Sequence, residues 1–140
     1  MEANADLATR FQIPPGTPIL KRTFLTKSRR EEGPLSIVIS YQPWDQFAEN
    51  PELLDVTNEP WPGGTMHQLS TIGIEVMKIV DEISTRPPTL MEAEVLDIDP
   101  GTSMFVLRKV ALDADERVVD VTDVFMPGDR TELIYEVGLN

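Results

Sequence analysis

The sequence predicts an α+β fold in which two similar hairpin units share one antiparallel sheet, with helices packed on one face. Three observations support this prediction. The phrase FQIPPGTPIL at positions 11–20 returns as LDIDPGTSMF at positions 96–105. Each copy follows a short helical stretch and precedes two β-rich runs. In the second run of each pair, apolar and polar side chains alternate, as they do in strands that bury one face.

The repeated unit is predicted to be a helix, a Pro-Gly turn and a hairpin. The two copies share four residue types at a constant offset of 98 − 13 = 85, namely Ile13, Pro15, Gly16 and Thr17 against Ile98, Pro100, Gly101 and Thr102. Asn4 and Thr89 are predicted N-caps of the two helices, and Thr89 with Glu92 forms a capping box. The alternative is that two Pro-Gly-Thr turns coincide by chance.

The β-rich runs supply the predicted strands, at 18–28, 35–43, 103–113 and 118–127. When the closing prolines of the two hairpins are aligned, one alternating set in each hairpin contains small polar residues. The set is Ser36, Val38 and Ser40 in the first unit and Asp120, Thr122 and Val124 in the second. A face of this kind lines a cleft or a layer of water.

The two units are joined by a stretch of different character. Positions 44–64 are rich in Pro, Asn and acidic residues and lack periodicity, which predicts a loop longer than compact domains usually carry. The next residues predict a two-turn helix with Thr65 as its N-cap and Gly73 as its C-terminal stop. The β-branched stretch at 74–87 predicts a strand that returns the chain to the second unit.

The composition excludes several classes of function. The chain has 140 residues, no cysteine and one histidine, which excludes disulfides, thiolate metal sites, cysteine nucleophiles and most zinc or catalytic-triad schemes. Its formal net charge of -12 argues against direct nucleic-acid binding, because nucleic-acid backbones are anionic. We expect one domain that binds a small ligand or a neutral or cationic partner, without a cofactor or metal. Since no long apolar run or signal-peptide pattern occurs, we expect a cytoplasmic location.

Five motifs in a fixed order give a family resemblance. They are GTPILKR, SYQP, GGTMHQL, TRPPTLMEAEVLDIDPGT and PGDRTELIYE. In these motifs, over about positions 5–136, the chain resembles the UTRA domain, the effector-binding half of HutC-type regulators in the GntR family of bacterial transcription factors, and is most similar to actinobacterial members. The resemblance implies a chorismate-lyase-like fold, with an antiparallel sheet of about six strands flanked by short helices.

The resemblance also implies a function. A UTRA domain is not an enzyme; it binds a small effector and signals to a winged helix-turn-helix domain that normally precedes it. Positions 1–140 contain no basic recognition helix, so we expect an isolated UTRA-like domain that reaches DNA only through that further domain. A homodimer is also expected, with Val76, Met77 and Ile79 as candidate interface residues.

In relatives that bind phosphorylated sugars, the ligand lies between the hairpin strands and the start of the small central helix. Thr65 occupies that helix start, although it is equally interpretable as a plain N-cap. Arginines on the strand before the first hairpin turn often assist in these relatives, and here Lys27 and Arg29 are the nearest basic residues that share one strand face; they could instead be solvated strand-end charges. His67 lies one turn into the helix, where a lone histidine is more often a surface or packing residue.

Other candidate site residues lie on the polar strand face. The family often carries an acid at the position of Val38 and another at the position of Asp120, and some relatives have a tyrosine where this chain has Met126. Ser40 lies on the same face. The two departures, Val38 and Met126, argue against a sugar-phosphate effector and favour a less polar one.

Three further alternatives remain open at this point. Asp120 could form a structural salt bridge with Arg22 or Arg108 instead of contacting a ligand. The domain could be an enzyme of the chorismate-lyase type, which shares the fold. It could also be a dimerisation module whose vestigial pocket is filled by its own side chains. For the closing motif, we expect Arg130 to anchor the last strand to a neighbouring carboxylate.

Overall fold

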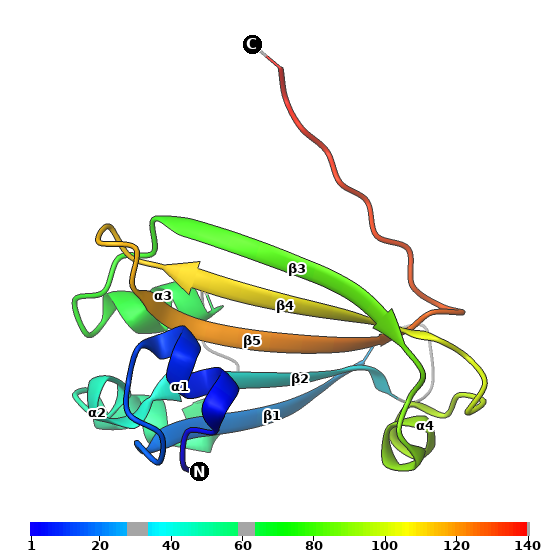
Figure 1. Cartoon of the computed structure of the whole chain (residues 1–140), viewed down its shortest axis with the longest axis horizontal. Coiled ribbons are helices and arrows are strands. Elements are labelled where there is room, and N and C mark those ends of the chain that lie inside the picture. The colour runs from blue at the N-terminus through cyan, green and yellow to red at the C-terminus, as the bar shows by residue number, and fades with distance from the viewer. Residues whose placement is uncertain (28–33, 59–63, 140) are drawn as a thin grey trace.

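A computed structural model describes residues 1–27, 34–58 and 64–139 of the chain. Within these residues, five antiparallel strands form one sheet in the order β1-β2-β5-β4-β3 (Figure 1). The strands are β1 (Ile19–Lys27), β2 (Pro34–Pro43), β3 (Lys78–Arg86), β4 (Met104–Leu112) and β5 (Val118–Pro127). The α+β class and all five strands derived from the residue pattern are confirmed. The resemblance implied about six strands, and positions 131–139 contain none.

Short helices complete the fold. They are α1 (Ala5–Phe11), α2 (Trp44–Phe47), α3 (Gly64–Ser70) and α4 (Leu90–Leu96), with 3-10 helices η1 (Pro51–Leu54) and η2 (Val56–Asn58). The prediction of an irregular loop at 44–64 was wrong for its described part, which contains α2, η1 and η2. Phe47 and Leu53 are buried there, and helical turns let both side chains reach the core. No described helix has the length and apolar character needed to cross a lipid bilayer.

The helix ends follow the predicted capping chemistry. The Asn4 side chain accepts a hydrogen bond from the backbone of Leu7, and Thr89 and Glu92 form the complete capping box. At the other end, Gln12 and Asp97 both adopt left-handed backbone conformations, with φ of 55° and 53°. These residues are separated by 97 − 12 = 85 positions, the same offset as the repeated phrase. Both helices therefore end by the same αL capping geometry.

The internal duplication is confirmed by the positions of whole elements. The segment α1-β1 recurs as α4-β4 at an offset of 85, since 90 − 5 and 104 − 19 both equal 85. Hairpin strand β2 recurs as β5 at an offset of 118 − 34 = 84. In the sheet, Ile39 of β2 lies opposite Asp123 of β5, and 123 − 39 is again 84. The two units thus meet at an approximate two-fold axis in the middle of the sheet.

The helices lie on both faces of the sheet, not on one as the sequence predicted (Figure 1). One face packs α1 through Phe11 against Val121, and α4 through Leu96 against Ile37. The other face packs α2, η1 and α3 in a separate cluster. That cluster contains Phe47, Leu53, Leu69, Ala111 and Val119. The prediction failed because the polar strand face also carries small apolar residues near one end, which provide a second packing surface.

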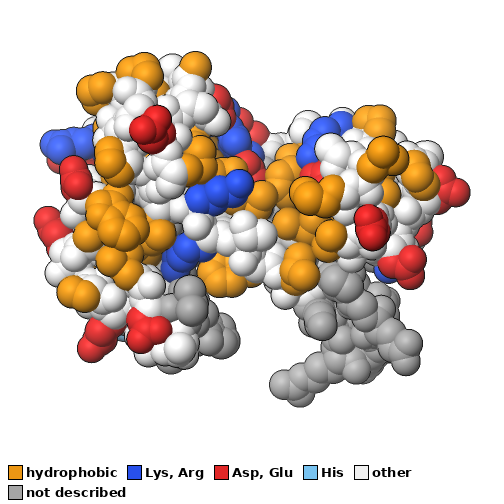
Figure 2. Space-filling model, turned by 90° about the horizontal axis from the view of Figure 1, so that it is seen from below, with side chains coloured by type: hydrophobic (Ala, Val, Ile, Leu, Met, Phe, Trp, Pro, Cys, Tyr) orange, Lys and Arg blue, Asp and Glu red, His pale blue; other side chains and the backbone are white. Residues whose placement is uncertain are grey.

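The helices leave the edge strand β3 uncovered. Nearly all of its residues are exposed, and it pairs with β4 on one side only. Figure 2 shows the molecule narrowing between the end that carries α1 and α2 and the end that carries α4, with acidic side chains on both parts. The fold therefore presents one long strand edge and a cluster of helices at one end, where the candidate site lies.

Candidate functional site

Thr65 and Asp120, two residues selected from the sequence, line one cavity of about 220 Å³. The cavity lies between α3 and the sheet face formed by β4 and β5. Its walls are Thr65, Met66, Leu69, Val76, Ile79, Lys109, Ala111, Asp120 and Thr122. Five of these side chains are apolar and four can form hydrogen bonds. Because the cavity is open, the alternative of a vestigial pocket filled by its own side chains is contradicted.

Asp120 is a buried carboxyl group on the sheet side of the cavity. Its Oδ1 accepts a hydrogen bond from Gln42 Nε2, and its Oδ2 accepts one of 2.8 Å from Thr122 Oγ1. Burial raises the pKa of Asp120 above 3.8, while these two hydrogen bonds and the positive charge of Arg22 act in the opposite direction. The site therefore holds an acid that is protonated more readily than an exposed aspartate.

Thr65 faces the cavity from the helix side. It is the second residue of α3, and the helix begins at Gly64, so Thr65 lies inside the helix and the prediction that it is the N-cap was wrong. Glycine at position 64 has φ of 66°, a conformation that suits glycine and turns the chain into the helix. One turn further on, Leu69 is buried against the sheet, which fixes the face that α3 presents to the cavity.

Lys109 supplies the positive charge of the cavity. It lies on β4 opposite Thr122 of β5 and Asp81 of β3. Its Nζ is 3.4 Å from the Asp81 carboxylate, and both side chains are partly exposed, so this ion pair is weak. The cavity therefore combines an apolar wall with one partly exposed cation and one buried acid.

Two buried polar atoms beside Asp120 have no hydrogen-bond partner among the described residues. They are Ser40 Oγ and Gln42 Oε1. Ser40 lies opposite Thr122 in the sheet, and Gln42 is bonded to Asp120 through its other amide atom. Since buried polar atoms are normally paired, these two atoms leave hydrogen-bonding capacity unused beside Asp120 at this end of β2.

The remaining predicted site residues do not line this cavity. His67 is exposed on α3. Val38 and Met126 are half-buried on the same sheet face, but nearer the other end of β5, where Val38 lies opposite Val124 and Met126 opposite Phe105. The Lys27 side chain and all of Arg29 lie outside the residues that the structure describes. Within the described residues, no group of three metal-ligating side chains occurs.

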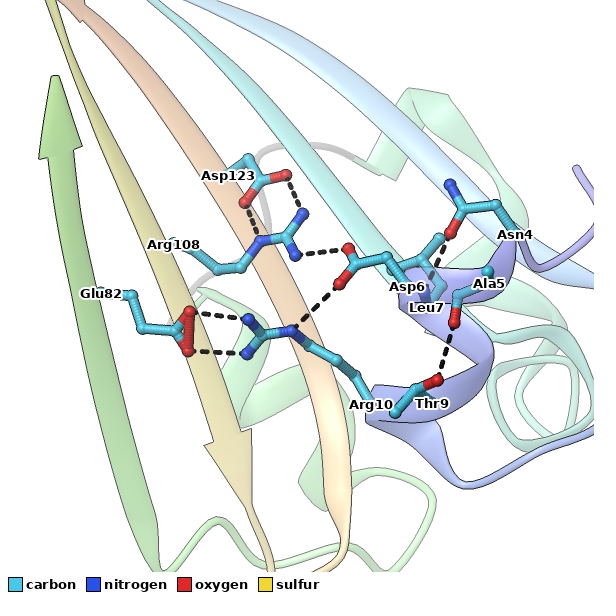
Figure 3. Close-up of polar contacts among 9 residues, drawn as sticks. All are labelled: Asn4, Ala5, Asp6, Leu7, Thr9, Arg10, Glu82, Arg108 and Asp123. Carbon is cyan, nitrogen blue, oxygen red and sulfur yellow. Dashed lines mark hydrogen bonds and ion pairs between the residues drawn. The ribbon is translucent and has the colours of Figure 1, made fainter. Parts of the chain in front are cut away.

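Arg108 does not pair with Asp120, because its side chain extends from the opposite face of the sheet. There it donates two hydrogen bonds to Asp123, at 2.7 and 2.8 Å, and one of 2.6 Å to Asp6 of α1 (Figure 3). Arg10 of α1 joins the same network by binding both carboxylate oxygens of Glu82, at 2.6 and 2.7 Å. The Arg108 alternative for Asp120 was therefore wrong, and the network instead ties α1 to the sheet.

Arg130 anchors the chain, though not mainly through a carboxylate. Its Nη2 donates to the backbone oxygens of Leu96 and Asp97, at 2.8 and 3.3 Å. The carboxylate it contacts is that of its neighbour Asp129, at 3.4 Å. Carbonyl groups at a helix C-terminus attract a cation, so the closing motif is attached to the end of α4.

Sequence reasoning missed most of the cavity wall. Lys109 and Ala111 became recognisable only through the register of β4 on β5, which sequence alone does not give. Thr122 was available from the sequence, since it follows Asp120 by two positions on the same strand face. Val76 and Ile79 were assigned to a dimer interface, but both contact the cavity.

A comparison with protein families decides what kind of domain this is. The family model described as the UTRA domain matches residues 1–132. The chain belongs to the UTRA family. UTRA domains are the effector domains of GntR-family transcriptional regulators and are not enzymes, so the alternative of a chorismate-lyase-type enzyme is set aside.

Curated relatives of this UTRA domain are longer proteins. An uncharacterized HTH-type transcriptional regulator of Rhizobium meliloti is 27% identical over 134 residues, which cover 96% of this chain and 52% of the relative. An uncharacterized HTH-type transcriptional regulator of Streptomyces coelicolor is 27% identical over 137 residues, which cover 97% of this chain and 50% of that relative. The UTRA domain thus spans about half the length of the curated relatives it matches.

Solved structures support the same fold. PhnF from Mycobacterium smegmatis has a TM-score of 0.79 at 22% identity, covering 100% of this UTRA domain and 59% of PhnF. The C-terminal domain of the histidine utilization repressor from Pseudomonas syringae has a TM-score of 0.80 at 15% identity. The match covers 99% of this UTRA domain and 92% of that structure. At these identities the likeness concerns the fold alone.

Proposed function

We propose that this UTRA domain binds a small effector in the cavity between α3 and β5, as the sensing part of a GntR-type transcriptional regulator. The observation that carries this proposal is the convergence of Thr65 from α3 and the buried Asp120 from β5 on one open cavity. A concave site with apolar walls and a few placed polar groups is the usual form of a small-molecule site.

The chemistry of the wall limits the effector. The cavity of about 220 Å³ is smaller than the roughly 300–1,000 Å³ typical of sites for drug-sized ligands. Its polar groups are a threonine hydroxyl on each side, the Asp120 carboxyl and the rim cation Lys109. We therefore infer a compact, largely apolar molecule with one or two hydrogen-bonding groups, in preference to a sugar phosphate.

The mechanism that fits this geometry is a population shift. A ligand that touches both Thr65 and Asp120 favours arrangements in which α3 is held against the sheet. In a homodimer, this change alters how the two copies present the DNA-binding domains of the whole regulator. We accordingly propose a cytoplasmic dimeric regulator that contacts DNA through a part other than this domain. The exposed residues Met77, which precedes β3, and Ile79, which lies in β3, remain the candidates for the dimer contact.

The proposal is tested by a thermal-shift screen of the 140-residue chain against several hundred metabolites. The set includes sugar phosphates, amino-acid derivatives and apolar lactones. A ligand that binds only the folded state raises Tm by mass action, and at 100 times its Kd it contributes about 2.7 kcal/mol. We expect a hit among compact, weakly polar compounds.

Matched variants assign the hit to the cavity. The variant Thr65→Ala/Asp120→Ala removes both converging polar groups and should abolish the Tm shift. The control Thr9→Ala/Asp115→Ala changes the same residue types at exposed positions away from the cavity and should retain it. A shift that persists in the first variant would place the ligand elsewhere, and the absence of any hit would count against the sensing function.

A further inference from the structure

The cavity between α3 and the sheet adjoins a second hollow, of about 460 Å³. This hollow, which we name the outer groove, lies between α3 and the stretch that leads from it to β3 (Figure 1). Its walls are Met66, Ser70, Gly73, Ile74, Glu75 and Val76. Met66 and Val76 also line the cavity. The two hollows therefore meet at these two side chains, and one ligand can extend from the cavity into the outer groove.

The outer groove follows one face of α3. Met66 and Ser70 are four positions apart, so they lie one above the other on this face, while Leu69 is buried against the sheet. The opposite wall is held close to the helix, because the Ile74 backbone N–H donates to Leu69 O at 3.0 Å and the Gly73 N–H donates to Ser70 O at 3.1 Å. The groove thus has a fixed position along one turn of α3, a shape that suits a chain better than a bulky ring.

The walls of the outer groove are mainly apolar. Met66, Ile74 and Val76 supply most of them, and Met66 is 53% exposed. The hydroxyl of Ser70 is already used, because it donates to the backbone oxygen of His67. A ligand that enters the groove therefore gains mainly by removing apolar surface from water. Met66 has an unbranched side chain with three rotatable bonds, so it can adjust to tails of different length.

The charges around the two hollows favour a neutral ligand. Among the described residues of the groove wall, Glu75 carries the charge, and it is exposed. In the cavity, Lys109 lies beside the Asp81 carboxylate, and Asp120 accepts hydrogen bonds from neutral side chains. The net charge of -12 repels anions. A cation that entered the small, mainly apolar cavity would lose its hydration.

We propose that the effector is a neutral amphiphile whose polar head lies in the cavity and whose aliphatic tail lies in the outer groove. Thr65 and Asp120 hold the head, and the tail covers Met66, Ile74 and Val76. The compact molecule that the cavity volume requires is then the head of the effector. This inference rests on the proposed function and specifies the shape and polarity of the effector.

Straight-chain primary amides test the proposal, because they share one neutral head and differ only in tail length. Acetamide, butanamide, hexanamide and octanamide are titrated into the isotope-labelled 140-residue chain, and Kd is measured by nuclear magnetic resonance. Full burial of a methylene group lowers Kd about fourfold. Since the groove is open on one side, we expect a decrease of about twofold per methylene group. The backbone signals of residues 73–76 should shift with hexanamide and octanamide and stay in place with acetamide.

Two glycines provide a matched pair of variants for the tail. Gly73 and Gly16 have φ of 78° and 86°, which asparagine tolerates better than most residues, and a Cβ at either position meets no atom within 4 Å. Gly73→Asn adds a polar side chain to the groove wall. It should remove the dependence of Kd on tail length and leave the Kd of acetamide unchanged. Gly16→Asn makes the same change away from the groove and should keep that dependence. Circular dichroism confirms that both variants are folded.

The cavity variant Thr65→Ala/Asp120→Ala separates the head from the tail. It should raise the Kd of every amide by the same factor, because all members lose the same head contacts. The ratio of the Kd values of hexanamide and octanamide should therefore stay as in the unmodified chain. Hexanoate and hexylamine carry the same tail on a charged head, and both should bind more weakly than hexanamide. Tighter binding of either would exclude a neutral head.

Other outcomes would overturn the inference. A Kd independent of tail length would confine the effector to the cavity and leave the proposed function standing. An equal dependence on tail length in Gly73→Asn and Gly16→Asn would place the tail outside the groove. Signals of residues 73–76 that move with protein concentration and not with amide would assign the groove to a second copy of the chain. If no amide binds, the inference fails, while the metabolite screen still decides the proposed function.

Discussion

Asp120 is a buried carboxylic acid whose neighbours Gln42 and Thr122 are neutral. Because burial raises its pKa in the folded state, the folded chain binds more protons than the unfolded chain above pH 3.8. The stability that this residue contributes is therefore greatest at low pH and is lost as the pH rises through the folded-state pKa.

We expect Asp120→Asn to remove this pH dependence. The free energy of unfolding, measured in urea between pH 4 and pH 7, should fall less with pH in the variant than in the unmodified chain. The exposed residue Asp115 provides the control, because Asp115→Asn should leave the pH dependence unchanged. A difference between Asp120→Asn and the unmodified chain that stays constant with pH would show that burial does not disfavour the charged form.

Glu92 has the opposite behaviour. Its carboxylate closes the capping box of α4 and accepts two hydrogen bonds from Arg86, at 2.7 and 2.9 Å, which lower its pKa from 4.5 to about 2. A lowered folded-state pKa contributes stability above pH 4.5, and that stability is lost as the pH falls towards 2.

Replacing this carboxylate should destabilise the fold. We expect Glu92→Gln to lower the free energy of unfolding at pH 7 by about 2 kcal/mol, since Arg86 is 38% exposed and solvent weakens the pair. The loss should shrink towards zero near pH 2, because the unmodified side chain is then protonated too. Urea titrations at pH 7 and near pH 2 measure the loss of stability. An equal loss at the two pH values would mean that it comes from the capping hydrogen bonds alone and not from the charge of Glu92.

At the scale of single residues, sequence reasoning succeeded where local chemistry decides. Asn4, Thr89 and Glu92 were predicted correctly because a cap depends on residues three positions apart. Asp120 was singled out through its position in the family pattern and lines the cavity, and its contact with a ligand stays a prediction. Ile79 of β3 and Lys109 and Ala111 of β4 also line the cavity. Their positions depend on the pairing of strands that are distant in sequence, which no local pattern predicts.

At the scale of elements, the ion-pair network that holds α1 offers a comparison between a buried and an exposed salt bridge. Arg108 neutralises Asp123, whose side chain is only 8% exposed, whereas Arg10 contacts Glu82, which is 44% exposed. Figure 3 shows both arginines between α1 and the strands. Removing the arginine partner of a buried carboxylate leaves a charge that water cannot solvate. An exposed carboxylate that loses its partner remains solvated by water.

We therefore expect Arg108→Gln to lower the free energy of unfolding by about 3 kcal/mol. Arg10→Gln, its matched control, should cost less than about 1 kcal/mol. Chemical denaturation at pH 7 measures both values. Equal losses would contradict the reasoning from burial, and a large loss for Arg10→Gln alone would mean that the Glu82 contact carries the attachment of α1.

Elements were predicted well where periodicity was strong. In the part of the chain that the structure describes, all five strands and three of the four α-helices were foreseen, but α2 and the two 3-10 helices between 44 and 58 were not. Phe47 and Leu53 are the buried residues of this stretch. Their spacing matches neither the period of a helix nor that of a strand, so the sequence shows no pattern from which these helices could be predicted. Which sheet face each helix covers also depends on tertiary packing.

At the scale of the whole molecule, the two repeated units share a single sheet and do not form separate bodies. The central ladder joins β2 to β5, and α4 of the second unit packs on Ile37 of the first. We expect unfolding in urea to be a single cooperative transition, with coincident curves from tryptophan fluorescence and far-ultraviolet circular dichroism. Two separated transitions would indicate that each unit folds alone.

The alternation of side chains along β5 has a consequence for communication across the molecule. Thr122 lines the cavity on one face of the sheet, and the next residue, Asp123, holds Arg108 on the other face. Arg108 in turn holds Asp6, near the start of the chain. The cavity and the contact that holds the N-terminal helix are thus attached to two consecutive residues of β5, so we expect a local twist of β5 to move both together.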